Sequence, residues 1–394
     1  MNPALRIGAV GFGLIAVCYG FARLAFGLFL PQMRDDLALS AGLAGVISGG
    51  AFAAYCVAII VSARLSERVG PRAVAVGAAL VAAIGMAGIA LAPSAYGLAA
   101  FVVLAGASTG LASPPMADVV AQAVAAKRQD STNAVINAGT SAGVALTGPI
   151  ALAAGSDWRI VFALFAGTAL LLAVAAFLAL PAAAMADRSS QAGGLPPLRA
   201  NLLRLVGAAF LMGAASTALW SFGGEIASLR LGWSTRGIGL LWIAIGAAGI
   251  VGAAAGWLIA RLGVNTVHRV GLAALAASIA LAGAGFTTPA LTLIGGAVFG
   301  AAYVMLTGVY LVWGTTTLHD RPAAGLMVGF LMIAVGQTAG APLFGLLMGH
   351  VSLQAAVAVF ALLGLAPSVF VHRPDNATDA DNAVSIKAQG SSAC

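Results

Sequence analysis

Charge is scarce in this chain of 394 residues: Asp, Glu, Lys and Arg make up 8% of it, and hydrophobic residues make up 61%. A soluble protein of this length needs a much more polar surface. The mean hydropathy of +1.02 agrees. The chain therefore belongs in a lipid bilayer, and its formal net charge of +7 is explained by orientation signals between apolar runs rather than by a nucleic-acid surface.

The sequence also lacks the patterns of soluble enzymes and metalloproteins. Of three cysteines, Cys18 and Cys56 lie inside apolar runs and Cys394 is the last residue, so we expect neither a disulfide framework nor a metal site. The four histidines show no ligand spacing. No P-loop, nucleophile elbow or paired-carboxylate motif is visible, so we expect no enzymatic activity, no ATP-driven step and no cofactor.

Long apolar runs are what the sequence has in abundance. A membrane-spanning helix needs about 20 such residues, and strands are excluded because alternation is absent and lipid accepts only helices or closed barrels. The first run lacks a convincing cleavage site and is too long for a signal peptide, so it is predicted to remain as a helix. The twelve predicted spans are 7–30, 43–63, 72–92, 97–124, 133–155, 158–181, 203–224, 237–260, 267–287, 289–314, 322–349 and 351–371.

The distribution of Lys and Arg predicts the orientation. Fourteen of the nineteen fall on one side of the predicted spans, Arg34, Arg159, Arg230 and Arg236 fall on the other, and Arg23 lies inside a span. The positive-inside rule then places both termini in the cytoplasm. A Gly-, Ser- and Pro-containing connection at 182–202 is predicted to be a flexible cytoplasmic linker between six-helix domains at 1–181 and 203–371, and the polar tail at 372–394 is predicted to be disordered.

A repeat with an offset of 193 residues relates the two predicted halves. The scarce residues Arg and Pro carry most of the information, because Gly and Leu matches arise easily in this composition. The aligned pairs are Leu65 with Leu258, Arg68 with Arg261, Gly70 with Gly263, Arg128 with Arg321, Gly143 with Gly336 and Pro149 with Pro342. This pattern predicts an all-α membrane protein of two pseudo-symmetric six-helix halves.

Two motifs carry a resemblance to a known family. The loop after the second span holds Leu65, Glu67, Arg68, Gly70 and Arg72, and its second copy holds Gly256, Leu258, Arg261 and Gly263. The fifth span holds Gly139, Gly143, Gly148 and Pro149. The chain thereby resembles the major facilitator superfamily of secondary transporters, and it is similar to uncharacterised bacterial permeases of that superfamily. The resemblance implies a multi-pass protein of the bacterial inner membrane, acting as a monomer on a small-molecule substrate.

The same resemblance implies a gate. It places Glu67 opposite the start of the eleventh helix near Pro322, where a helix dipole stabilises an anion, with Arg128 as a second partner. Ala260 stands where the second copy would carry its acid, so the gate is expected to be asymmetric. It would hold the halves together while the cavity faces outward. A further departure is Val102 at the position where many proton-coupled exporters carry an Arg, which puts the usual antiport role of that helix in doubt.

Two charges inside predicted spans are candidates for function, because a charge in the bilayer is costly. Arg23 is interpreted as an anchor for an anionic substrate, and the alternative is a structural Arg bonded to helix-end carbonyls or snorkelling outward. Asp118, after Pro114-Pro115, is interpreted as a proton-coupling group, and the alternative is a structural carboxyl. Glu225 is expected at the rim of the seventh span.

Uncharged polar and aromatic side chains complete the expected substrate site. Each of the aromatic residues could equally serve ordinary interhelical packing. The candidates are Tyr19, Asn133, Asn137, Trp220, Tyr303, Tyr310 and Gln337. Trp242 and Trp313, near span ends, are expected in the interfacial belt.

These observations predict a secondary transporter that moves a small solute by alternating access, coupled to protons. An organic anion is favoured because of Arg23. An exporter of lipophilic, drug-like compounds is the alternative within the same class, favoured by the Gly148-Pro149 pair. A non-transporting membrane receptor or scaffold is the alternative from another class.

Overall fold

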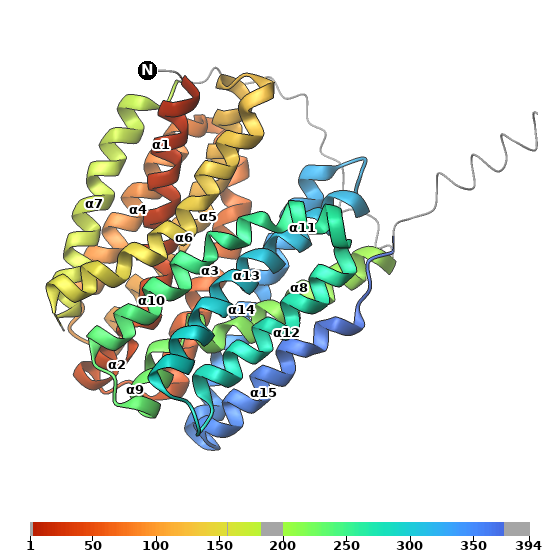
Figure 1. The fold of residues 1–394 in the computed structure, drawn as a ribbon. Coiled ribbons are helices and arrows are strands. Elements are labelled where there is room, and N and C mark those ends of the chain that lie inside the picture. The colour runs from red at the N-terminus through yellow and green to blue at the C-terminus, as the bar shows by residue number, and fades with distance from the viewer. Residues whose placement is uncertain (1–2, 156, 183–199, 374–394) are drawn as a thin grey trace, which may run out of the picture.

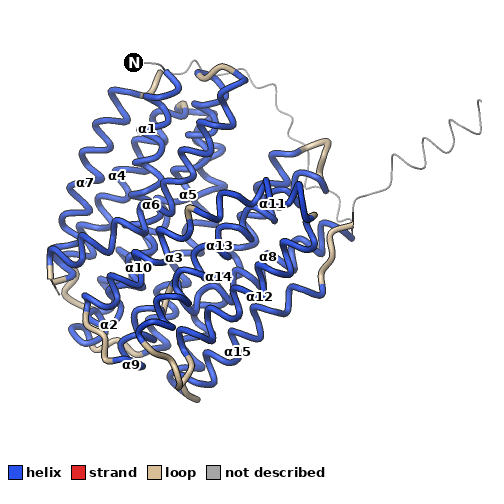
Figure 2. Tube along the Cα trace, viewed as in Figure 1, coloured by secondary structure: helices blue, strands red, loops and turns tan. Residues whose placement is uncertain are grey.

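Helices form all the regular structure of the described residues, which in this computed structural model are 3–155, 157–182 and 200–373 (Figure 2). The first half comprises α1 (Pro3–Ile15), η1 (Ala16–Leu24), α2 (Ala25–Leu37), α3 (Ala41–Val69), α4 (Pro71–Leu91), α5 (Ala95–Ala123), α6 (Ala126–Ala154) and α7 (Trp158–Ala179). The second half comprises α8 (Ala200–Trp220), α9 (Gly223–Leu231), α10 (Thr235–Gly249), η2 (Val251–Ala254), α11 (Ala255–Leu262), α12 (Val264–Gly283), α13 (Pro289–Thr317), α14 (Pro322–His350), α15 (Leu353–Leu365) and η3 (Ala366–Val369).

The predicted architecture of twelve spans in two halves is confirmed. Within the described residues, ten helices are long and apolar enough to cross a membrane, and Thr235–Gly249 and Leu353–Val369 are two shorter apolar helices. The first span is one continuous helix from Pro3 to Leu37. The eighth is interrupted by the short 3-10 segment η2 between α10 and α11. The proposed linker and tail lie mostly outside the described residues, so the predicted domain bounds stay a prediction.

The repeat is visible in the backbone at the two motif loops. Gly70 ends α3 with φ 83° and ψ 150°, and Gly263 ends α11 with φ 78° and ψ 156°. These are left-handed φ values that side chains with a Cβ rarely adopt. The next residue begins another helix in both copies, and at the first loop it is Pro71, whose fixed φ suits a first helical position. The same sharp turn therefore recurs at the predicted offset.

Small residues allow the helices of each half to approach closely. A Cβ added at Gly20 of η1 would lie 2.4 Å from the backbone carbon of Gly143 in α6, and one added at Gly139 would lie 2.4 Å from the Phe12 carbonyl oxygen. Such contacts leave no room for a side chain. They replace the hydrophobic effect as the source of helix association in lipid, where packing between helices is the main attraction. The glycines of the fifth-span motif thus hold the first span in place.

The two halves converge on one side of the molecule and diverge on the other. In Figure 1, α2, α9 and the lower part of α10 lie together, whereas the start of α1 and the region of α11 lie well apart. We call the side on which α1 begins the N-terminal side, and the side on which α2 ends the opposite side. Between them, α3 packs along α14, and α6 packs along α10.

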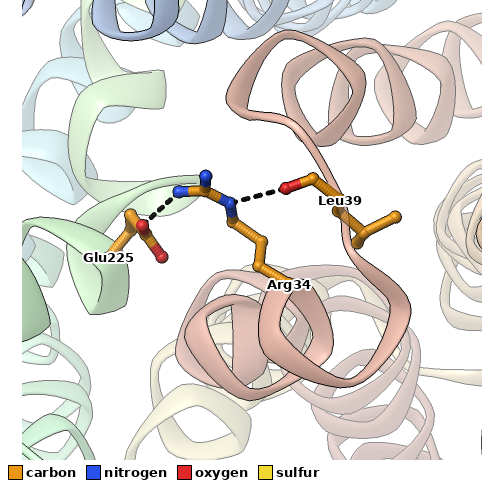
Figure 3. Close-up of polar contacts among 3 residues, drawn as sticks. All are labelled: Arg34, Leu39 and Glu225. Carbon is orange, nitrogen blue, oxygen red and sulfur yellow. Dashed lines mark hydrogen bonds and ion pairs between the residues drawn. The ribbon is translucent and has the colours of Figure 1, made fainter.

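Polar contacts close the opposite side. Arg34 of α2 forms an ion pair with Glu225 of α9, and its Nε also donates to the Leu39 carbonyl at 2.9 Å (Figure 3). Gln32 donates to the Thr235 hydroxyl at 2.7 Å. Glu225, expected as a rim residue, is only 5% exposed, so its carboxylate is a buried partner between the halves rather than a free surface charge.

The hydroxyls of Ser48 and Ser221 add a third bond between the halves, at 2.7 Å. Ser48 lies about two turns inside α3 and Ser221 directly follows α8, and both side chains are buried. Three polar links, two from α2 and one from α3, therefore join the first half to the second on this side. Ser221 is a useful reporter position because separation of the halves would expose it.

We predict that Glu225→Gln favours opening of the opposite side, because the neutral amide cannot form the ion pair. An ion pair of this kind contributes up to about 1 kcal/mol when exposed and more when buried, so labelling of Ser221→Cys by a membrane-impermeant maleimide should accelerate at least about fivefold. The measurement requires a background without Cys18, Cys56 and Cys394.

Asp35→Asn is the matched control, because Asp35 is an exposed acid next to Arg34 at the end of α2. It should leave the labelling rate close to that of the parent. Equal rates in the Glu225→Gln variant and the parent would show that the ion pair does not hold this side closed.

Candidate functional site

Arg23 lies deep in the first span, at the end of the π-helical segment η1. Its side chain is buried, at 8% exposed. Wide π turns are rare and often occur at functional sites. None of the carboxylates of the described residues forms an ion pair with Arg23. A buried cation without an anion is costly, so this arrangement calls for a compensating interaction.

Aromatic rings supply part of that compensation. The guanidinium carbon of Arg23 lies 4.7 Å from the centroid of Phe52, 4.8 Å from that of Tyr55 and 5.4 Å from that of Tyr19. The negative faces of such rings attract a cation. Tyr19 and Tyr55 also meet edge to face, with centroids 6.3 Å apart. The first half therefore surrounds the cation with rings from its own span and from α3.

Gln337 of α14 joins Arg23 to the second half. Its Oε1 accepts a hydrogen bond from Arg23 Nη2 at 3.0 Å. Its amide nitrogen lies 3.2 Å from both the Ser216 hydroxyl and the Tyr303 hydroxyl. Gln337 is fully buried, so the network lies in a medium of low dielectric constant, where each bond is stronger than in water. The bond between Arg23 and Gln337 crosses between the halves.

Three N–H donors near this network have no acceptor. Arg23 Nε, Arg23 Nη1 and Trp220 Nε1 are buried and make no hydrogen bond to any described residue. Trp220 packs edge to face against Tyr303 and Phe299, with centroids 5.2 Å apart in each case. Unsatisfied buried donors of this kind cost free energy.

The structure brings five of the predicted substrate residues together: Arg23, Tyr19, Gln337, Tyr303 and Trp220. Tyr310 is placed two turns further along α13, where its hydroxyl lies 3.1 Å from His268 Nε2 and donates to the Ala208 carbonyl. It is not part of the Arg23 network. Tyr19 is only part-buried and bonds the Ser113 hydroxyl at 2.8 Å, which places α5 beside the same region.

Asn137 lies on the face of α6 that turns toward the second half. One turn further along the same face, Ser141 meets Gly249 of α10, where a Cβ would lie 2.8 Å from the Ser141 hydroxyl. Asn137 itself is exposed, and Asn133 is half-buried. The contact between α6 and α10 therefore ends near Ser141, and the residues on its N-terminal side face the space between the diverging halves.

Asp118 lies on α5, five residues after Ser113 and therefore about 7.5 Å closer to the N-terminal side at 1.5 Å per residue. It is half-buried. Pro114 and Pro115 lie within the same helix, and the missing backbone donors of proline loosen its hydrogen-bond ladder. Asp118 thus stands between the Arg23 network and the N-terminal side, on a helix that contacts η1.

Some residues of the two sequence motifs pack between helices, and others are exposed at the surface. Gly148 contacts α10, where its Cβ would lie 2.4 Å from the Gly239 carbonyl oxygen, and Pro149 lies within α6. Glu67, Arg68 and Arg128 are exposed, as is Leu65. Arg72 lies over the Phe177 ring at 5.1 Å and Arg261 over the Trp257 ring at 4.1 Å, and a Cβ at Gly256 would meet open space. Among the described residues Glu67 forms no ion pair, so the predicted gate is not engaged in this conformation.

The two tryptophans expected in the interfacial belt are buried instead. Trp242 and Trp313 are both 0% exposed. Trp313 Nε1 donates to Asn201 Oδ1 at 3.1 Å, and its ring meets His268 edge to face at 5.5 Å. That expectation was wrong because position near a span end does not reveal which face of the helix a side chain occupies.

Five residues of the region were missed from the sequence: Phe52, Tyr55, Ser113, Ser216 and Phe299. Phe52 and Tyr55 are three residues apart and so share one face of α3. In a chain with 7% aromatic residues, such a pair deep in a span was a usable signal. The two serines offered no signal, because single hydroxyls are common in spans and bond their own helix.

The comparisons with known proteins agree with this fold. The family model of the Major Facilitator Superfamily matches residues 12–334. No curated protein sequence matches the chain. The structure of the nucleoside transporter NupG (D323A mutant) superimposes with a TM-score of 0.78 at 12% identity, covering 93% of this chain and 98% of that chain.

Two further solved structures show the same fold. The xylose transporter XylE from E. coli, in a partially occluded inward-open conformation, gives a TM-score of 0.74 at 14% identity and covers 94% of this chain and 97% of that chain. The structure of the human organic anion transporter MFSD10 superimposes with a TM-score of 0.64 at 18% identity, covering 94% of this chain and 100% of that chain. At these identities the likeness concerns the fold alone. The family match spans most of the sequence, and the chain is a member of the major facilitator superfamily, a transporter rather than an enzyme.

Proposed function

We propose that this transporter moves a small organic anion by alternating access. The observation that carries the proposal is the buried guanidinium of Arg23, in which two nitrogens, Nε and Nη1, have neither an acceptor nor a carboxylate partner among the described residues. Guanidinium binds carboxylate through two parallel hydrogen bonds. An anion bound there would neutralise the charge and satisfy the donors.

The position of the site explains how binding would be coupled to movement. Arg23 belongs to the first half, and Gln337, Tyr303 and Trp220 belong to the second. A solute held between them contacts both halves, so its binding energy depends on how the halves are arranged. Rocking of one half against the other about a site near the midplane is the usual form of alternating access.

The conformation fits a state open toward the N-terminal side. The opposite side is closed by the Arg34–Glu225 pair and the bond between Gln32 and Thr235. The excess of Lys and Arg on the N-terminal side favours its placement in the cytoplasm, which would make this the inward-facing state of a bacterial inner-membrane protein acting as a monomer. Glu67 is exposed and forms no ion pair with the described residues, which agrees with a gate on that side that closes in the outward-facing state with Arg128 as a partner.

Proton coupling is proposed to run through Asp118. Its place on α5 between the Arg23 network and the N-terminal side would let a proton bound there respond to the opening of that side. The second candidate function is export of lipophilic compounds. It is favoured by the rings of Phe52, Tyr55, Trp220 and Phe299 around the site, and it predicts that neutral or cationic drugs bind without need of Arg23.

We expect a thermal-shift screen of the purified protein against organic anions, amines and lipophilic drugs to select anions. Arg23→Gln should weaken the best anion by about 10- to 100-fold, which corresponds to the loss of hydrogen bonds to a charged group. It should also abolish transport of that anion in proteoliposomes. Because the change removes a costly buried charge, the ligand-free protein should melt at the same or a higher temperature.

Arg6→Gln provides the control, since Arg6 is an exposed Arg of the same span. It should affect neither binding nor melting. Should Arg23→Gln lower the melting temperature of the ligand-free protein and leave anion binding intact, Arg23 would be a structural residue and the anion proposal would fail.

We expect Asp118→Asn to separate exchange from coupled uptake. The amide cannot bind and release a proton, so uptake driven by a pH gradient should fall to the level measured without a gradient. Exchange of labelled for unlabelled solute should persist. The measurement compares both activities in the same proteoliposomes. Asp130→Asn, an exposed acid of α6, should retain both, and retention of gradient-driven uptake by Asp118→Asn would exclude Asp118 as the coupling group.

A further inference from the structure

The number of charges at the site limits the charge of the solute. Arg23 is the one basic residue of the described spans that lies more than two turns from either end of its span. A monoanion bound to it would give a neutral complex. A dianion would leave one negative charge in a region of low dielectric constant, and a cation would add a second positive charge.

The surroundings of Arg23 limit the direction from which an anion can reach its guanidinium. Phe52, Tyr55 and Tyr19 lie close to the guanidinium, so an incoming group has to use its N–H edges. Gln337 takes one hydrogen of Nη2, and Nε and Nη1 remain without acceptors. A guanidinium has two edges on which N–H groups lie in parallel, one formed by Nε and Nη2 and the other by Nη1 and Nη2. The hydrogen of Nη2 that bonds Gln337 belongs to one of these edges, so the other edge remains free. A planar carboxylate matches that edge.

The second half offers an aromatic wall to the rest of the solute. Phe299, Tyr303 and Trp220 pack together, with Phe299 and Tyr303 stacked at 6.0 Å and Trp220 edge to face against both. Trp220 Nε1 is a buried donor without an acceptor. Aromatic groups pack favourably against such rings beyond the effect of buried area alone, and the indole N–H can bond an oxygen of the solute.

We infer that the solute is an aromatic monocarboxylate, held by its carboxylate on Arg23, with its ring against Trp220, Phe299 and Tyr303. This inference rests on the proposed function and names its substrate class. A sugar would need many polar partners, whereas the wall is formed by rings. An aliphatic carboxylate could use Arg23 but would gain less from the rings, and a neutral aromatic compound would leave the Arg23 donors unsatisfied.

Four small probes separate these contributions: benzoate, hexanoate, benzamide and terephthalate. Their binding to the full-length protein in nanodiscs at pH 7.5 can be measured by titration calorimetry, which avoids the passive membrane permeation of weak acids. Benzoate should bind tightest. Hexanoate should bind about two- to tenfold more weakly, because it lacks the ring. Benzamide and terephthalate should bind at least about tenfold more weakly, because one lacks the charge and the other carries two.

Variants then test the two parts of the site separately. Trp220→Leu should bring the ratio of benzoate to hexanoate affinity close to one, and Trp257→Leu, at an exposed position of α11, should leave the ratio unchanged. Arg23→Gln should weaken both carboxylates by a similar factor. The ratio is informative even if Trp220→Leu lowers stability, since both probes are measured on the same folded protein.

The outcomes distinguish this inference from the function it rests on. Equal binding of benzoate and hexanoate, both dependent on Arg23, would overturn the aromatic class and leave the anion site standing. Tighter binding of terephthalate than of benzoate would overturn the single charge. Binding of none of the carboxylates would overturn the inference, and if the wider screen also found no anion that depends on Arg23, the proposed function would fail with it.

Discussion

The buried charge of Arg23 is the constraint on which the rest of the structure depends. A guanidinium inside the first span is costly, and the molecule compensates with rings from the first half and with one amide from the second. The hydrogen bond from Arg23 to Gln337 therefore combines two roles. It reduces the cost of the charge, and it joins the two bodies that have to move relative to each other.

The remainder of the contact between the halves is of a different kind. Gly45 and Gly49 of α3 lie against the backbone of α14, and Gly246 of α10 lies against Ala145 of α6. Such surfaces of small side chains are smooth and make few directional bonds, so they allow one half to tilt on the other at low cost. Directional bonds are concentrated at two heights: the Arg23 network in the middle and the Arg34 and Gln32 contacts at the closed end.

Composition and run lengths were sufficient to predict the fold, because the bilayer permits so few solutions for a chain with so little charge. The positions of Arg68, Gly70 and their copies predicted the repeat, and the matching backbone angles of Gly70 and Gly263 agree with it.

The site was less predictable from the sequence than the fold. Arg23 and Gln337 stand out as polar residues in apolar runs, but they are 314 residues apart, and their hydrogen bond depends on how the halves pack. The roles of Phe52 and Tyr55 depend on helix rotation, which periodicity does not define when nearly all faces are apolar. The burial of Trp242 and Glu225 was missed for the same reason.

The Arg34–Glu225 ion pair and the Arg23–Gln337 hydrogen bond differ in how the surrounding solution affects them. Arg34 keeps 24% of its side chain exposed, so dissolved ions reach it, and at physiological ionic strength the screening length is about 8 Å. The Arg23–Gln337 bond is buried and pairs a cation with a neutral amide, so ions hardly influence it. Salt on the closed side would therefore weaken the ion pair while leaving the centre and the neutral hydrogen bonds intact, so the conformational preference of the carrier would respond to the salinity of that one compartment.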